Sequence, residues 1–309
     1  MSLPVKPTPV SPDTIGPDRR PISSCARLLR GLAVLVKAPL SLMAAFPAVC
    51  AFIISAGAPA AGQVALFFCG TVFSAFGASA LNQWSERSHD AAMHRTRARP
   101  IPSGILSPAA ALTLALLFAM TGVGLLFIFF NAPAALLSAL TIVLYWLVYT
   151  PLKQWTPWCT EVGAVAGALP ALIGSAAASG TITPIGWTLF LIVFLWQMPH
   201  FHPIAWRHRE DYRRGGYRML ATIDDAGRKA AGRSLAYAVL LLGAATLPVL
   251  WGAGPLYWIP ATIAGLIFIL RTAEFGDPVN RDPAAHRLFR FSLVYLAVVL
   301  TALLIDHLF

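Results

Sequence analysis

The sequence predicts an all-α polytopic membrane protein, a bundle of nine transmembrane helices with the N-terminus in the cytoplasm. The first observation is composition: 57% of the 309 residues are hydrophobic and only 12% are charged, against about 25% charged residues in a soluble domain. The second is the length of the apolar runs, since ~20 residues cross ~30 Å of hydrocarbon as a helix. The third is where lysine and arginine fall between these runs. Together they exclude a disordered chain, a disulfide-rich secreted module and an ordinary cytosolic enzyme.

The first 30 residues are polar and rich in proline, and they lack the apolar core of a signal peptide. Asp13 and Asp18 interrupt any transit-peptide pattern. We therefore expect residues 1–30 to form a disordered cytoplasmic tail. Residues 31–309 should form a single transmembrane domain.

Nine apolar runs follow the tail. Only helices or closed barrels satisfy the backbone inside a bilayer, and these runs do not alternate as barrel strands must. Prolines within the runs, such as Pro47 and Pro170, should kink helices rather than end them. The expected spans are residues 32–56, 62–83, 106–130, 132–150, 160–180, 184–204, 234–252, 255–271 and 288–309.

The positive charges give the orientation. All 23 Lys and Arg residues lie in the tail, at Lys37, or in the connections after the second, fourth, sixth and eighth spans. A cytoplasmic N-terminus places every one of them on the cytoplasmic side. The net charge of +10 is thus explained as loop charge that sets the topology, so no nucleic-acid partner is expected. The four cysteines show no metal-binding or redox spacing and are interpreted as packing residues.

A polar segment at the end of the second span carries the first candidate site. Asn82, Glu86 and Asp90 are spaced four apart, so on a helix each step turns by only about 40° and the three share one face. Two carboxylates and an amide suit Mg²⁺, which takes a few protein oxygens and leaves other positions to phosphate and water. Arg95, Arg97 and Arg99 follow, and guanidinium groups bind phosphate. The spacing leaves two interpretations open, a metal–diphosphate site or a helix end with solvated charges.

A second polar segment follows the sixth span. Glu210 and Asp211 are adjacent acids among arginines and could hold a second cation. His200 and His202 lie at the membrane edge, where histidines more often form hydrogen bonds than bind metals. Lys153, which closes the fourth span, is either a topology charge or a third cation for phosphate.

These motifs together resemble a known family. Asn82-x-x-x-Glu86-x-x-x-Asp90, Tyr149-x-x-x-Lys153, a second acidic loop and nine helices are similar to the intramembrane prenyltransferases of the UbiA type. Within that superfamily, the likeness is closest to the members that farnesylate protohaem IX. It rests on Asp90-Ala-Ala-Met93, Arg99-Pro100, Trp196-Gln-Met-Pro-His200-Phe201 and Glu210-Asp211-Tyr212, and it covers most of residues 30–305.

The resemblance implies a role for each matching residue. Asn82, Glu86, Asp90, Glu210 and Asp211 would serve Mg²⁺, and Glu86, Asp90, Tyr149 and Lys153 would be the catalytic set. Arg95, Arg99, Lys153 and Arg209 would bind the diphosphate, and His200 or His202 would contact haem. One departure concerns the second loop, where many members have Asp-x-x-x-Asp and this chain has Arg207 or His208 in the leading position.

The implied activity is Mg²⁺-assisted farnesyl transfer from farnesyl diphosphate to a vinyl group of haem b, giving haem O. It implies an enzyme of the inner cell membrane with cytoplasmic active-site loops, and haem A synthase or terminal-oxidase assembly factors as partners. Three alternatives stay open: a prenyltransferase with another aromatic or tetrapyrrole acceptor, a transporter, and a haem carrier without chemistry. Transporters place polar groups near the membrane midplane, whereas Asp306 is the only charge far from the cytoplasmic face here.

Overall fold

The structure of the chain is a computed structural model that describes residues 24–309. Within that range nine helices are long and apolar enough to cross a membrane, which confirms the expected number and order of spans. They are α2 (Ala38–Ala56), α3 (Ala61–Ala92), α4 (Pro108–Phe129), α5 to α6 (Ala132–Trp155), α7 (Cys159–Ser179), α8 (Pro184–Arg207), α11 to η3 (Arg228–Trp251), α12 (Pro255–Glu274) and α13 (Arg281–Leu308).

Two spans contain a change of helix type. The fourth span runs from α5 (Ala132–Val143) through a π-helical turn, η2 (Leu144–Tyr149), into α6 (Thr150–Trp155). The seventh runs from α11 (Arg228–Ala244) into a 3₁₀ turn, η3 (Leu247–Trp251). Three short helices lie outside the spans: α1 (Ser24–Leu35), α9 (Arg209–Arg214) and α10 (Leu220–Ile223).

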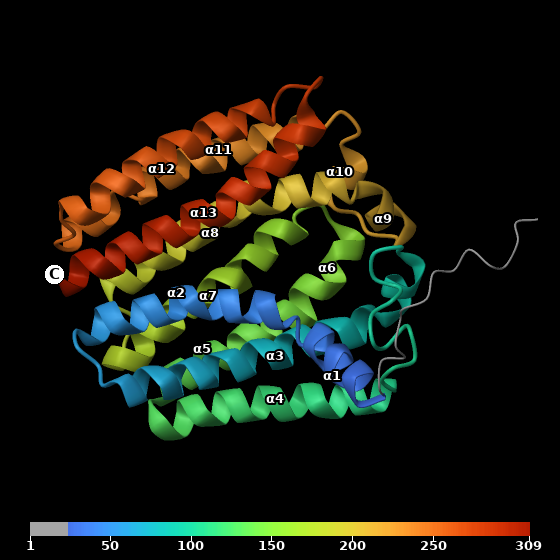
Figure 1. Cartoon of the computed structure of the whole chain (residues 1–309), viewed down its shortest axis with the longest axis horizontal. Coiled ribbons are helices and arrows are strands. Elements are labelled where there is room, and N and C mark those ends of the chain that lie inside the picture. Colours follow the sequence, from blue (N-terminus) through green and yellow to red (C-terminus); the bar gives the residue numbers. More distant parts are fainter. Residues whose placement is uncertain (1–23) are drawn as a thin grey trace, which may run out of the picture.

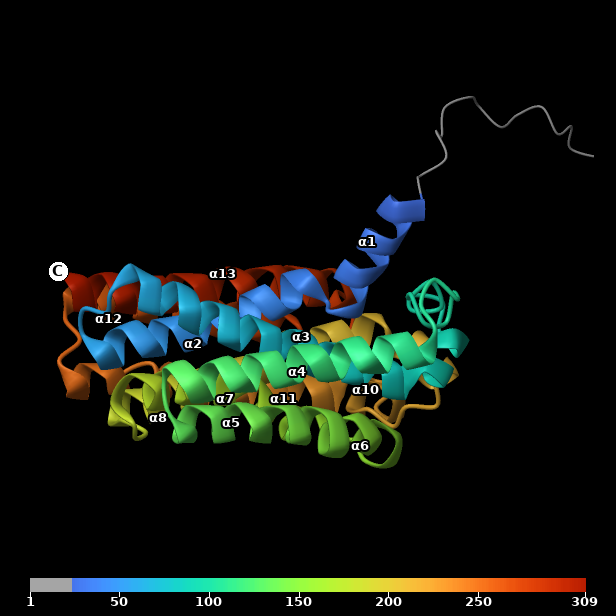
Figure 2. The same cartoon turned by 90° about the horizontal axis from the view of Figure 1, so that it is seen from below.

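Figure 1 shows the spans side by side, with α6, α9 and α10 at one end and the C-terminus at the other. Figure 2 shows the same arrangement from below, with α1 projecting from the end that carries α6 and α10. Every Lys and Arg of the described residues lies in the connections at this first end, in or just after α1, or in the adjoining helical turns. The structure thus gathers the positive charge at one end of the bundle.

The helix at the start of the described residues corrects one boundary. Residues 24–30 were expected to belong to a disordered tail, but they form the first half of α1. Gly31 and Leu35 on this helix are buried, and Gly31 lies against Ile105. This packing orders the segment, which its local polarity did not indicate. The prediction for residues 1–23 lies outside the described residues.

At the opposite end of the bundle, which carries no Lys or Arg among the described residues, side chains cap the helices that begin there. Asn131 caps α5 by accepting a hydrogen bond from the Ala134 backbone N–H at 2.9 Å. Asp306 does the same for α12, accepting from the backbone N–H groups of Gly254 (2.6 Å) and Tyr257 (3.2 Å). A carboxylate at a helix N-terminus is stabilised by the unpaired N–H groups there. Asp306, the one acid at this end within residues 24–309, therefore caps a helix.

The orientation of the bundle is a prediction that cysteine labelling tests. In a background with the exposed Cys25 and Cys69 changed to serine, we expect Ala92→Cys and Asp225→Cys to be labelled by a membrane-impermeant reagent only in opened cells. Thr181→Cys, at the other end, should be labelled in intact cells. All three residues are exposed. Labelling of Thr181→Cys only after opening the cells would contradict a cytoplasmic N-terminus.

Candidate active site

The half of α3 at the positively charged end of the bundle carries the three oxygen donors, as the spacing predicted. Asn82, Glu86 and Asp90 lie on one face and are 0%, 5% and 0% exposed. The helix continues from the expected end at residue 83 to Ala92, because each of these polar side chains finds a partner on another segment.

Each carboxylate is paired with a cation of the chain itself. Lys153 Nζ donates to Glu86 Oε1 at 2.6 Å. Arg99 Nη1 donates to both Asp90 carboxylate oxygens, at 2.8 and 2.7 Å. The two buried acids are therefore balanced by two buried or half-buried bases. The structure brings together Glu86, Asp90, Lys153 and Arg99, all of which the sequence analysis selected.

The π-helical turn η2 places Tyr149 and Lys153. The Lys153 ammonium lies 4.4 Å from the centre of the Tyr149 ring. That ring packs on Gly163 of α7, where an added Cβ would be 2.6 Å from two ring carbons. The glycine is therefore needed for the close approach of Tyr149. Thr150, the next residue, accepts a hydrogen bond from the Asn82 amide at 3.0 Å and so ties the turn to α3.

Lys37 belongs to the same cluster, although the sequence analysis treated it as a topology charge. Its Nζ donates to Asn82 Oδ1 at 2.7 Å. Burial lowers the pKa of the Lys37 ammonium, and the positive charges of Arg99 and Lys153 lower it further, against Glu86 and Tyr145, which raise it. Its φ of 47° is left-handed, a conformation that costs a non-glycine residue about 1 kcal/mol or more. This strain is the kind found at functional sites, and only the structure reveals it.

The second acidic segment is only partly joined to the first. Asp211 accepts hydrogen bonds from the backbone N–H groups of His94 (3.1 Å) and Arg95 (3.0 Å). Burial raises the pKa of the Asp211 carboxyl, but these two donors outweigh it, so its pKa lies below the usual value. Glu210 instead pairs with Arg213 and faces outward. In the described residues, the Asp211 carboxylate contacts the backbone of the first loop, and Glu210 contacts neither acid of α3.

The two outlying arginines also lie apart from the buried pairs. The Arg95 guanidinium lies 5.9 Å from the Tyr212 ring centre. Arg209 stacks on Trp206 at 4.2 Å and donates to the Trp206 carbonyl. In the structure as described, neither guanidinium contacts Glu86 or Asp90. Their assignment to the diphosphate stays a prediction.

The two candidate haem-contacting histidines face opposite sides of α8, since residues two apart on a helix differ by about 200°. His200 Nδ1 hydrogen-bonds Ser292 of α13 at 2.7 Å, and its ring stacks on Trp196 at 4.5 Å. His202 Nδ1 hydrogen-bonds Ser234 of α11 at 2.9 Å, and its enclosed Nε2 has no partner among the residues that the structure describes. The two side chains therefore cannot contact one haem from the same face.

The oxygen atoms of this cluster suit a cation that takes most of its ligands from phosphate and water and only a few from the protein. Among residues 24–309, no three His, Cys, Asp or Glu side chains are close enough to hold a metal ion by themselves. Two carboxylates and an amide on one face are oxygen donors, which suit Mg²⁺ completed by phosphate and water. Glu86 and Asp90 could hold such a cation if their ion pairs with Lys153 and Arg99 opened.

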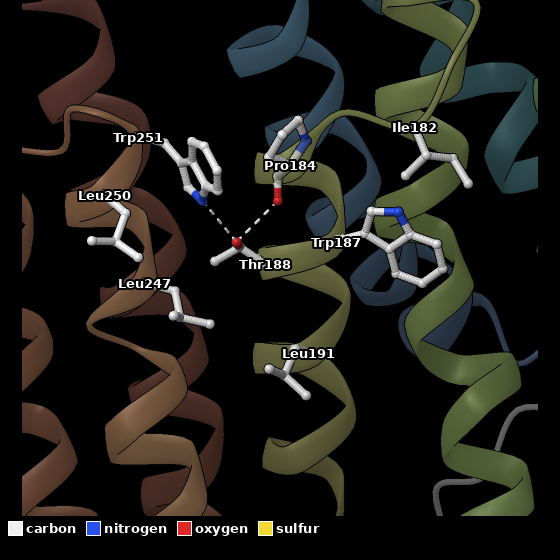
Figure 3. A pocket seen from close by; sticks show the side chains of 8 residues that line it. All are labelled: Ile182, Pro184, Trp187, Thr188, Leu191, Leu247, Leu250 and Trp251. Carbon is white, nitrogen blue, oxygen red and sulfur yellow. Dashed lines mark hydrogen bonds between the residues drawn. The ribbon is translucent and has the colours of Figure 1, made fainter.

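The cavity shown in Figure 3 lies elsewhere. It has a volume of about 410 Å³ at the uncharged end of α8, beside η3. Its lining is apolar apart from Thr188, which accepts a hydrogen bond from the Trp251 indole at 3.3 Å. No acid or base lines it, so it does not extend the charged cluster.

Comparison with known proteins decides the family. The pattern of the UbiA prenyltransferase family matches residues 42–294. The chain belongs to the UbiA prenyltransferase family. A UbiA-family relative from Opitutus terrae, a protoheme IX farnesyltransferase, is 44% identical over 248 residues, which cover 80% of this chain and 84% of that protein.

Solved UbiA structures share the fold. A UbiA homologue from Aeropyrum pernix K1 superposes with a TM-score of 0.73 at 19% identity, over 87% of this chain and 98% of that one. A UbiA homologue from Archaeoglobus fulgidus bound to GPP and Mg²⁺ gives a TM-score of 0.66 at 13% identity, over 88% and 99%. The expected UbiA bundle is confirmed.

Proposed function

We propose that this chain is the enzyme that transfers a farnesyl group from farnesyl diphosphate to a vinyl group of protohaem IX, making haem O. Family membership and the 44% identical protoheme IX farnesyltransferase support the reaction. The observation that carries the chemistry is the buried set of two carboxylates and two cations, Glu86 with Lys153 and Asp90 with Arg99. The UbiA homologue bound to GPP and Mg²⁺ supports Mg²⁺ as the cofactor.

The paired charges indicate how the substrate enters. Anionic phosphate oxygens compete with Glu86 and Asp90 for Lys153 and Arg99, because both kinds of acceptor bind the same donors. The freed carboxylates can then hold Mg²⁺, which neutralises charge on the departing diphosphate. Lys37 lies beside this exchange and would bind a further phosphate oxygen. The two acids thus exchange their bases for Mg²⁺, and the two bases exchange their acids for phosphate oxygens. No buried charge is left unpaired.

The bond changes follow from this arrangement. The bond between farnesyl C1 and oxygen breaks, and the electron pair leaves with the diphosphate, which Lys153 and Arg99 hold. The vinyl group of haem then attacks the allylic cation, which leaves a carbocation on the vinyl carbon next to the porphyrin ring. A water molecule adds to that carbon and releases a proton to solvent, which gives the hydroxyl of the product. The farnesyl tail gains about 0.8 kcal/mol for each CH₂ group that it buries among apolar helices. Tyr149, against Lys153, presents an aromatic face that stabilises a neighbouring cation.

A direct assay tests the reaction. Purified protein in lipid nanodiscs should convert haem b and labelled farnesyl diphosphate to a product with the mass of haem O. EDTA should stop the conversion, and added Mg²⁺ should restore it. 4-Hydroxybenzoate in place of haem should give no labelled product. Prenylation of 4-hydroxybenzoate but not of haem would replace this proposal by a different acceptor.

His200 is the better candidate for haem, since His202 Nε2 is enclosed while its Nδ1 is held by Ser234 of α11. Imidazole is a common axial ligand of haem iron. Iron held there would fix the distance between the haem vinyl group and the farnesyl C1 atom. We expect His200→Ala to weaken haem binding about tenfold or more and to change the haem absorption spectrum, with the affinity for farnesyl diphosphate unchanged. His202→Gln is the matched control. An unaltered spectrum and haem affinity in His200→Ala would remove His200 from the site.

A further inference from the structure

A tyrosine that belongs to none of the sequence motifs lies against the candidate active site. Tyr217, between α9 and α10, is only 3% exposed. Its ring packs among Met93, Cys159 and Met219. The Lys153 ammonium lies 5.8 Å from the centre of this ring. The side chain thus lies beside one member of the buried ion pairs.

The Tyr217 hydroxyl is enclosed and has no hydrogen-bond partner in the part of the chain that the structure describes. Leaving such a buried group unpaired destabilises the protein, because the hydroxyl has lost its hydrogen bonds to water. Burial raises the pKa of this phenol, and the nearby charges of Glu86 and Asp90 raise it further, against Lys153, which lowers it. The hydroxyl therefore stays protonated at neutral pH and is available as a donor. It lies within the electrostatic reach of both acids of the site but donates to neither.

The backbone around Tyr217 is fixed to the two helices that supply the site. Arg218 N–H donates to the Lys153 carbonyl at 2.7 Å. His89 of α3 hydrogen-bonds the Gly215 carbonyl through Nδ1 at 2.8 Å. Gly216, with a φ of 73°, makes the turn that L-residues rarely adopt. These contacts hold Tyr217 in place relative to both Glu86 and Lys153.

We propose that the Tyr217 hydroxyl donates a hydrogen bond to a diphosphate oxygen of the prenyl substrate. This inference rests on the proposed function. Phosphate oxygens are strong acceptors, and they enter this cluster when Lys153 exchanges Glu86 for the substrate. The hydroxyl then gains the partner that the chain does not provide. Because it is neutral, it adds a directional contact to the diphosphate without adding charge to the site.

The chain contains a matched control for this hydroxyl. Tyr295 on α13 is 0% exposed, stacks on Phe268 at 4.8 Å, and has an enclosed hydroxyl that also lacks a partner among residues 24–309. It packs in a separate apolar cluster with Tyr257 and Val299. Tyr217→Phe and Tyr295→Phe therefore remove the same atom from similar surroundings, one beside the charged cluster and one away from it.

The experiment measures binding of farnesyl thiolodiphosphate, a slowly reacting analogue, to the full chain in nanodiscs with Mg²⁺ by calorimetry. Tyr217→Phe should weaken binding about tenfold, as expected for a lost hydrogen bond to a charged group. Tyr295→Phe should stay within about twofold of the wild-type value. Both variants should unfold without ligand at or above the wild-type temperature, because each loses an unpaired buried hydroxyl. The KM for haem should not change.

Two results would overturn this inference and leave the proposed function standing. One is a Tyr217→Phe variant that binds the analogue as tightly as wild type. The other is a loss of affinity that comes with an equal loss of stability without ligand, since that would show a structural role. A wild-type chain that does not bind the analogue at all would overturn the proposed function itself, and the two failures are therefore distinguishable.

Discussion

Replacing Asp90 with asparagine is expected to lower turnover about 1,000-fold while the protein stays folded and inserted. Asp90 is fully buried and holds Arg99 through both carboxylate oxygens. Asparagine keeps the shape but removes the charge that a cation on the diphosphate requires. A 1,000-fold loss corresponds to about 4 kcal/mol of transition-state stabilisation. The measurement is haem O formation at saturating farnesyl diphosphate and Mg²⁺.

Glu274→Gln provides the control for this variant. Glu274 also accepts hydrogen bonds from two arginines, Arg271 (2.9 Å) and Arg287 (3.0 Å), at the same end of the bundle. It is half-exposed and lies outside the buried cluster. Its loss should leave turnover within about twofold of wild type. Near wild-type turnover by Asp90→Asn would remove Asp90 from the metal–diphosphate site.

Lys153→Met should reduce both activity and stability. The substitution keeps an apolar stem but leaves the Glu86 carboxylate buried without its main partner, which costs about 3–5 kcal/mol. Activity should fall about 100-fold or more, because a cation for the diphosphate is lost. Chemical unfolding in detergent micelles measures the first effect, and the haem O assay measures the second.

The double variant Glu86→Gln/Lys153→Met separates these two roles. It removes both charges of the pair, so it should recover most of the lost stability. Turnover should stay at or below the level of the single variant. If the double variant regained activity, the pair would be structural only. If Lys153→Met were as stable as wild type, the ion pair would not hold α6 against α3.

The spans could be predicted because a bilayer requires apolar runs of about 20 residues. The tertiary partners of the polar groups could not be predicted. The helical spacing of Asn82, Glu86 and Asp90 extends α3 beyond its apolar run, but their partners Thr150, Lys153 and Arg99 come from other segments. α1 begins before the expected boundary because it packs on residues near Ile105. The hydropathy of the sequence does not indicate these tertiary contacts of α3 and α1.

The candidate site could be predicted in part. A spacing of four places donors on one helix face, so the α3 residues follow from the sequence alone. Adjacent acids are harder, since neighbouring helical residues point about 100° apart. Asp211 therefore reaches the first loop whereas Glu210 faces outward. Lys37 and Tyr217 carry no spacing signal, because a left-handed backbone and a glycine turn bring them to the cluster.

The π-helical turn at Leu144–Tyr149 makes the length of the fourth span as important as its residues. A π turn holds one residue more than an α turn, and each residue of an α-helix adds about 100° of rotation. Deleting Leu147, which is 54% exposed, would remove this extra residue, restore regular α-helical winding and keep Lys153 in phase with Glu86. Deleting a residue from the regular winding of α5 would instead turn Lys153 by about 100° away from Glu86, although every charged residue is still present.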